Sequence, residues 1–213
     1  MAILRFRSKP KEALSRADVI NALIVRYGYR SYLEIGVNTQ AQPGWSHDSI
    51  EIETKHGVDP NPAVDATFPV TSDEFFERYV SQTYDIVFVD GLHLFEQAYR
   101  DIVNSLAWLN ENGTIVVHDS KPEKEITQRR DRVSDAWHGD VWKAILKLRL
   151  EATELEIFTV DTDEGCSVIR RGAQQLMRVD DPPEDMYTWD FYKRHRDEIL
   201  QLIDVQEFER RLL

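Results

Sequence analysis

The sequence predicts an α/β fold with a mostly parallel, doubly wound sheet, and three observations point to this class. Strand-like and helix-like segments alternate five times along the chain, which favours parallel strands joined by crossover helices. Residues 86–89 form an unbroken run of β-branched and aromatic residues, as expected of a central strand covered on both faces. Four expected strands end in acidic or histidine side chains, and in an open α/β sheet such ends meet at the ligand-binding crevice.

The N-terminal half of the chain is expected to supply three strands and their connections. Apolar spacing predicts a helix over 11–28 that stops at Gly28. Thr71 followed by acidic residues is a helix start signal, because carboxylates in the first turn are favoured by the helix dipole. The other segments expected here are strands over 31–37, 55–59 and 66–68 and a short acidic helix over 46–53.

The second half is expected to complete the sheet and to end in a helical tail. After the central strand, the pattern predicts a helix over 94–109, a strand over 114–119, a polar loop over 120–138, a helix over 140–150 and a hairpin of 155–160 and 166–169. We therefore expect one domain over 1–175, with its N-terminal helix at 11–28 and its sheet core at 31–170. A helical extension over 184–213 would pack on the same domain, and its aromatic residues suggest a homodimer contact.

The composition limits the class of partner. A formal net charge of -12 and a pI near 5.0 argue against nucleic acid or an anionic membrane as the main partner. The single cysteine, Cys166, excludes an internal disulfide and fits a reducing compartment. The chain has no stretch resembling a signal peptide and no apolar run near the ~20 residues of a membrane span. We expect a soluble, cytoplasmic protein.

The first two strand ends predict a nucleoside-type cofactor. Glu34 and Gly36 place a carboxylate and a close backbone approach at the end of the first strand. Asp59 ends the second strand, where acids accept hydrogen bonds from ribose hydroxyls. No Gly-x-Gly-x-x-Gly motif is present, which disfavours a pyrophosphate cradle and hence a nicotinamide-dependent dehydrogenase. S-adenosylmethionine, a nucleoside without phosphates, fits better.

With these features the chain resembles the class I S-adenosylmethionine-dependent methyltransferases, in particular a small bacterial group (methyltransferase domain 24-like) often met beside sugar and polysaccharide genes. The segments that carry the resemblance are 32–37, 57–62, 71–76, 85–93, 100–102, 118–119 and 139–145. The resemblance implies a Rossmann-like sheet of seven strands whose last strand is antiparallel. It also implies cofactor contacts at Glu34, Gly36, Asp59 and Asp90, and around Ser72, where the adenine would lie.

The last two strand ends suggest the methyl-transfer site. In related metal-dependent sugar and catechol O-methyltransferases, acids ending the fourth and fifth strands hold a divalent ion. Asp90 and Asp119 match those positions, with His118 as an adjacent ligand, and an imidazole would favour Mn²⁺ over Mg²⁺. The ion would lower the pKa of an acceptor hydroxyl, and His93, beside Asp90, could take its proton.

Other roles for these residues stay open. His118 could instead be an inward-facing strand residue bonded to backbone, Asp119 a cap for the following loop, and His93 a helix-start residue. In the loop over 120–138, Arg129, Arg130 and Arg132 could form a solvated face or bind a phosphate or carboxylate of the acceptor.

Two functions remain for the chain as a whole. The first is O-methylation of a small hydroxylated acceptor of the sugar or sugar-nucleotide type, possibly assisted by Mn²⁺ or Mg²⁺. The second is a methyltransferase-fold protein that binds an adenosyl ligand or a partner without catalysis. Gln40 stands where the family usually has a second glycine, which favours the second function modestly, whereas the set of Asp90, His93, His118 and Asp119 favours the first.

Overall fold

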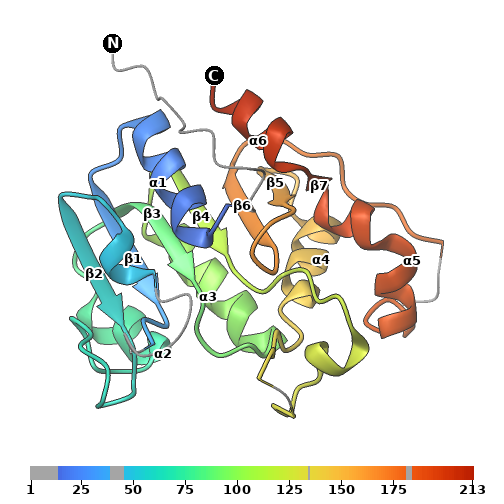
Figure 1. The fold of residues 1–213 in the computed structure, drawn as a ribbon, viewed down its shortest axis with the longest axis horizontal. Helices are drawn as coiled ribbons and strands as arrows, with labels where there is room; N and C mark the ends of the chain where they lie inside the picture. Colours follow the sequence, from blue (N-terminus) through green and yellow to red (C-terminus); the bar gives the residue numbers. More distant parts are fainter. Residues whose placement is uncertain (1–13, 39–45, 134, 181–183) are drawn as a thin grey trace.

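The computed structural model describes residues 14–38, 46–133, 135–180 and 184–213, which build one seven-stranded sheet flanked by helices (Figure 1). The strand order is β2-β1-β3-β4-β6-β5-β7, and β6 is the strand that pairs antiparallel with its neighbours. The expected doubly wound, mostly parallel sheet of seven strands is confirmed. The strands are β1 (Ser31–Ile35), β2 (Thr54–Val58), β3 (Tyr84–Val89), β4 (Leu109–Val117), β5 (Leu155–Val160), β6 (Cys166–Arg171) and β7 (Leu202–Ile203).

Helices cover both faces of this sheet. The α-helices are α1 (Arg16–Tyr27), α2 (Ser72–Glu74), α3 (Phe95–Ala107), α4 (Trp142–Glu151), α5 (Trp189–Leu200) and α6 (Val205–Arg211). Three further helical turns are η1 (His47–Ser49), η2 (Phe75–Tyr79) and η3 (Glu125–Gln128). Helix α1 begins at a capping box between Ser15 and Asp18 and stops at Gly28, which adopts a left-handed φ of 67°. Both ends therefore follow from local sequence. None of the described helices is long and apolar enough to cross a membrane.

The strand residues divide between two apolar cores. On β3, Val87 and Val89 belong to the core under α3, α4 and α5, whereas Ile86 and Phe88 belong to the core under α1 and α6. This alternation follows from the two-residue period of a strand. It explains why the central strand reads as continuously apolar, since each of its faces is buried.

The expected third strand over 66–68 is wrong. Phe68 makes only a single isolated bridge to Val58. The Val70 N–H, which would form the next bond of the ladder, donates back to the Phe68 carbonyl at 2.9 Å, so the pairing does not extend. The Phe68 ring instead packs on Phe75, with the ring centroids 4.9 Å apart.

Two other expected boundaries also change. The acidic helix over 46–53 is reduced to the three-residue turn η1, and β4 begins at Leu109, ahead of the start expected at residue 114. A register shift between Tyr84 and Ile86 lets β3 pair with both halves of β4. Glycine is needed at position 113, because a Cβ there would lie only 2.8 Å from the Asp85 carbonyl oxygen.

The C-terminal segment supplies both helices and the seventh strand. Helix α5 ends at Gln201, which adopts a left-handed φ of 45°, and β7 then pairs with β5 at the edge of the sheet. Five large apolar side chains of this segment are buried against the chain's own core: Phe191, Tyr192, Ile199, Leu200 and Phe208. The division of the chain at residue 175 stays a prediction.

Candidate active site

A cavity of about 680 Å³ opens where β1 to β4 end. Seven of the eight residues singled out from the sequence line it: Gly36, Asp59, Ser72, Asp90, His93, His118 and Asp119. These residues come from four strand ends and one helix start, so the parallel sheet brings them together. Glu34 is not among the residues that line the cavity.

Gly36 allows the ends of β1 and β3 to approach each other. Its φ is 86°, and a Cβ at this position would stand 2.2 Å from the carbonyl oxygen of Asp90. Its N–H donates to the Val58 carbonyl at 2.8 Å, which ties β1 to β2 as well. Any other residue would force the two strand ends apart.

Glu34 supports the cavity from behind. Its carboxylate is buried and lies 2.5 Å from Nδ1 of His47, and it accepts hydrogen bonds from Tyr32 and Ser46. Burial raises the pKa of Glu34, an effect that His47 and Tyr32 partly oppose. Its contacts hold the residues on either side of 39–45. Gln40 and Gly44 lie outside the described residues.

Asp59 presents an oriented carboxylate to the cavity. One oxygen accepts the main-chain N–H of Asn38 at 3.0 Å, and the other accepts that of Asn61 at 2.9 Å. A carboxylate oxygen has about two acceptor sites, so each keeps one for a ligand hydroxyl. The side chain is therefore fixed in place and still able to bind.

Ser72 belongs to a polar wall between α2 and α3. Nε2 of Gln97 lies 3.1 Å from the Ser72 hydroxyl and 3.0 Å from the carboxylate of buried Asp101. Burial raises the pKa of Asp101 to about 6, although hydrogen bonds from Ser72 and Gln97 oppose this shift. Both Ser72 and Gln97 line the cavity, and Gln97 was not identified from the sequence.

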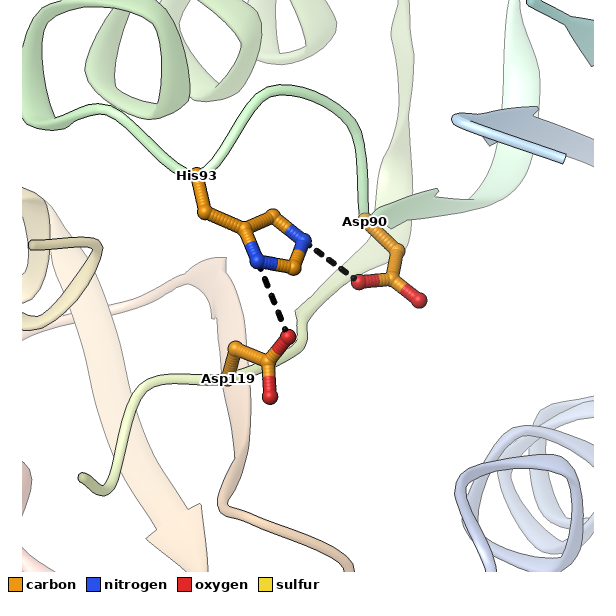
Figure 2. Close-up of side chains that lie close together, drawn as sticks. All are labelled: Asp90, His93 and Asp119. Carbon is orange, nitrogen blue, oxygen red and sulfur yellow. Dashed lines mark ion pairs between the residues drawn. The ribbon is translucent and has the colours of Figure 1, made fainter. Parts of the chain in front are cut away.

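Asp90, His93 and Asp119 form the centre of the site (Figure 2). The His93 ring lies between the two acids, with Nε2 3.3 Å from Asp90 and Nδ1 3.2 Å from Asp119. Nδ1 also lies 2.9 Å from the carbonyl oxygen of Trp137, which can only accept, so Nδ1 carries a proton. Although burial opposes the charge, these acids raise the pKa of His93. Burial likewise opposes ionisation of Asp90, but His118 and His93 keep its pKa well below its usual value.

His118 contacts the same two acids from the sheet side. Nε2 lies 2.8 Å from the Asp163 carbonyl oxygen, so this nitrogen donates. Nδ1 lies 3.3 Å from both Asp90 and Asp119 and makes no hydrogen bond of good geometry. In a neutral ring a buried lone pair would face two carboxylates, which requires either a second proton or a metal ion. The acids raise the pKa of His118 well above its usual value despite burial.

These donors suit a divalent ion. Asp90, His93 and Asp119 offer donor atoms that all lie within 4.8 Å of one another. His118 is the better nitrogen ligand, because its backbone contact leaves Nδ1 facing the acids, whereas Nδ1–H of His93 is held by Trp137. Two acids with an imidazole favour Mn²⁺ or a similar ion over Mg²⁺.

Four further residues of the site were not identified from the sequence. Arg16, Trp137, His138 and Glu164 all line the cavity. The Trp137 ring stacks on His93 with 5.1 Å between centroids, and Nε2 of His138 lies 2.6 Å from the Glu164 carboxylate. The polar loop expected over 120–138 was the only sequence signal for Trp137 and His138. Nothing local in the sequence marks Arg16 or Glu164.

The loop arginines divide between two roles. Arg129 pairs with Asp131, and Arg130 pairs with Glu96 and buried Asp140. These two stabilise the loop itself. Arg132 is the one of the three that lines the cavity.

Comparison with known proteins agrees with this geometry. Residues 33–120 match a family model described as a methyltransferase domain. No curated protein matches the chain.

Solved structures with the same fold include a Podospora anserina methyltransferase, PaMTH1, bound to S-adenosylhomocysteine. It is 14% identical, with 78% of its chain and 74% of this chain covered and a TM-score of 0.55. Another is the O-methyltransferase TomG of Streptomyces achromogenes, which takes part in tomaymycin synthesis, in complex with S-adenosylmethionine. It is 14% identical, with 83% of its chain and 77% of this chain covered and a TM-score of 0.53.

At such identities these similarities show a shared fold. The family model further identifies the kind of domain that residues 33–120 resemble. Residues 33–120 are similar to a methyltransferase domain, and the chain shares its fold with solved S-adenosylmethionine-dependent methyltransferases, as the sequence resemblance predicts.

Proposed function

We propose that the protein transfers a methyl group from S-adenosylmethionine to a hydroxyl of a small acceptor of the sugar or sugar-nucleotide type, assisted by a divalent ion. One observation carries the proposal. The oriented carboxylate of Asp59 and the cluster of Asp90, His93 and Asp119 line one and the same cavity. Cofactor and acceptor can therefore be held side by side, which is the main requirement of methyl transfer.

The cofactor would occupy the half of the cavity nearest β1 and β2. Asp59 would accept hydrogen bonds from the ribose hydroxyls, and Ser72, next to Gln97, would lie beside the adenine. Gly36 leaves room for the ligand beside the β1 end, and Asp90 borders the half where the methyl group would lie. Glu34 would act through the segment that it holds, since it lies outside the cavity.

The ion would bind between Asp90, His118 and Asp119, where it would lower the pKa of the acceptor hydroxyl. His93 is the proposed proton acceptor, and Nε2 is the nitrogen concerned because Nδ1–H is held by the Trp137 carbonyl. Since Nε2 contacts Asp90 at 3.3 Å, the role requires the acceptor hydroxyl to replace that contact. The contacts of Nδ1 with the Trp137 carbonyl oxygen and Asp119 then keep the ring oriented while the proton moves.

The acceptor would bind in the half formed by the loop over 120–138 and the turn between β5 and β6. Trp137, beside His93, offers an aromatic surface of the kind on which sugar rings and planar groups pack. Arg132 offers a cation at the same rim for an acidic group of the acceptor. Loops vary more than the sheet, so the sheet positions the chemistry and the loops select the acceptor.

Calorimetry with S-adenosylhomocysteine, repeated with Mn²⁺, Mg²⁺ or chelator, tests the proposal together with turnover of hydroxylated acceptors. We expect S-adenosylhomocysteine to bind under every condition, and we expect chelator to abolish turnover. Equal turnover with chelator would remove the ion from the mechanism. Binding of the product with no turnover of any acceptor would instead support the non-catalytic alternative.

A variant separates the chemistry from binding. His93→Gln should lower turnover by about 10²–10⁴-fold while keeping affinity for S-adenosylhomocysteine, because it removes the proton acceptor and leaves Asp59 in place. His56→Gln is the matched control, since His56 bonds Tyr84 and does not line the cavity. Unchanged turnover in His93→Gln would contradict the role of His93. The homodimer and the cytoplasmic location stay predictions.

A further inference from the structure

Arg16, the first residue of α1, carries a positive charge into the centre of the site. Nη1 lies 2.9 Å from Oδ2 of Asp90. The rest of the guanidinium holds Asp163, with Nε and Nη2 at 3.1 and 3.0 Å from its two carboxylate oxygens. The main-chain N–H of Arg16 donates to the same carboxylate at 2.6 Å.

This charge is fixed in two ways. The fork on Asp163 holds the guanidinium independently of Asp90, and the side chain is only 18% exposed, so water and salt screen it weakly. An arginine in a protein does not lose its proton. The charge therefore stays beside Asp90 whatever else binds there.

Each of the two carboxylate oxygens of Asp90 thus faces a different position for a cation. Oδ2 is taken by Arg16, and Oδ1 is 3.3 Å from both His93 and His118, at the position proposed for the divalent ion. Two cations on one carboxylate that is only 16% exposed repel each other. We infer that Arg16 is a built-in competitor of the divalent ion, which balances Asp90 in the free protein and weakens ion binding. This inference rests on the metal proposed above.

The sign of a mutational effect distinguishes competition from support. A group that merely orients a ligand strengthens metal binding, and its removal costs about 10–100-fold in affinity. A competing charge has the opposite effect, because its removal leaves Asp90 with a full negative charge for the ion. The same substitution therefore moves the affinity in opposite directions under the two interpretations.

Titration calorimetry with Mn²⁺ alone provides the test, on the full chain without cofactor. Arg16→Gln should bind Mn²⁺ at least about tenfold more tightly than the wild type, and Arg16→Lys, which keeps the charge, should stay within about threefold of it. Arg30→Gln is the matched control, because it removes one charge at an exposed pair with Glu53 away from the cavity. Affinity that is unchanged or lower in Arg16→Gln would overturn the inference while leaving the metal in place. No Mn²⁺ binding by either the wild type or Arg16→Gln would overturn the metal itself, and the inference with it.

A second measurement follows ion binding by the wild-type protein and needs the Arg16→Lys variant only to assign one signal. In a protein labelled with [¹⁵N]arginine, the Nε–H signal of Arg16 is the one missing from the Arg16→Lys spectrum. Addition of Zn²⁺, which is diamagnetic, should shift that signal as Asp90 is drawn to the ion. A signal that stays in place while calorimetry detects Zn²⁺ binding would contradict the competition.

Discussion

Asp59 shows how a single side chain is prepared for a ligand. Main-chain N–H groups of Asn38 and Asn61 hold its two carboxylate oxygens at the carboxyl end of β2, and the residue is 9% exposed. Asp59→Asn should weaken S-adenosylhomocysteine binding by about 10–100-fold, because charge-assisted hydrogen bonds to the ribose are lost. Calorimetry measures the change. Asp65→Asn is the control, because it makes the same change of charge at an exposed residue outside the cavity. Equal affinities for the two variants would place the ribose elsewhere.

Asp101 gives the fold a dependence on pH. Burial raises its pKa to about 6 from an ordinary 3.8. Because the folded-state pKa is the higher one, its stabilising contribution is full below about pH 4 and is lost as the pH rises through about 6. The loss amounts to about 3 kcal/mol, from 1.36 kcal/mol per unit of pKa difference.

Asp101→Asn should remove this dependence. The amide has the same shape and no charge, so the variant should unfold at higher denaturant than the wild type near about pH 8 and at a similar concentration near about pH 4. Denaturant titrations at the two pH values measure the difference. A gap that stays constant between them would show that Asp101 does not titrate in this range.

At the scale of elements, Gly36 joins the ends of two strands. Both Gly36 and Gly28 have a left-handed φ, but a Cβ at Gly36 would stand 2.2 Å from the Asp90 carbonyl oxygen, whereas nothing lies within 4 Å of one at Gly28. Gly28→Ala should cost only the left-handed strain of about 1–2 kcal/mol. Gly36→Ala should cost clearly more and also abolish S-adenosylhomocysteine binding, since β1 and β3 must separate. Similar losses of unfolding free energy in the two variants would contradict the close approach.

The C-terminal helices belong to the same core as the sheet. Leu200 is fully buried at the end of α5, whereas Leu213 is 96% exposed. Leu200→Ala should lower the free energy of unfolding by about 2–5 kcal/mol, and Leu213→Ala by less than about 0.5 kcal/mol. Denaturant unfolding compares the two. A small effect of Leu200→Ala would mean that α5 is not needed by the core.

At the scale of the whole molecule, the sheet was predictable because its signals are local. The central strand β3 is an apolar run, and the acids that follow β2, β3 and β4 fall at the same edge of the sheet, so Asp59, Asp90 and Asp119 meet without any knowledge of loops. The strand expected at 66–68 fails because the Val70 N–H bonds back to the Phe68 carbonyl, which ends the pairing after a single bridge. The edge strand β7 was missed because α5 stops at Gln201, where no glycine marks the end.

The rest of the site depends on contacts between distant parts of the chain. Arg16 reaches Asp90 and Asp163 from the N-terminal helix, and His138 meets Glu164 from another loop. Asp163 and Glu164 adopt left-handed φ values of 42° and 61° in the turn between β5 and β6, a conformation that costs free energy and is retained because these contacts hold it. The sequence predicts the hairpin, but no pattern of residue types reports the contacts that its turn makes with Arg16 and His138.

The central claim is that the strand ends build one site for an adenosyl cofactor and a divalent ion. A crystal structure of the protein soaked with S-adenosylhomocysteine and Mn²⁺ tests it most directly. We predict the ribose hydroxyls on Asp59, the adenine beside Ser72 and an anomalous manganese peak in contact with Asp90, His118 and Asp119. Density for the adenosyl group away from Asp59, or manganese bound at other residues while this cluster stays unchanged, would contradict the account.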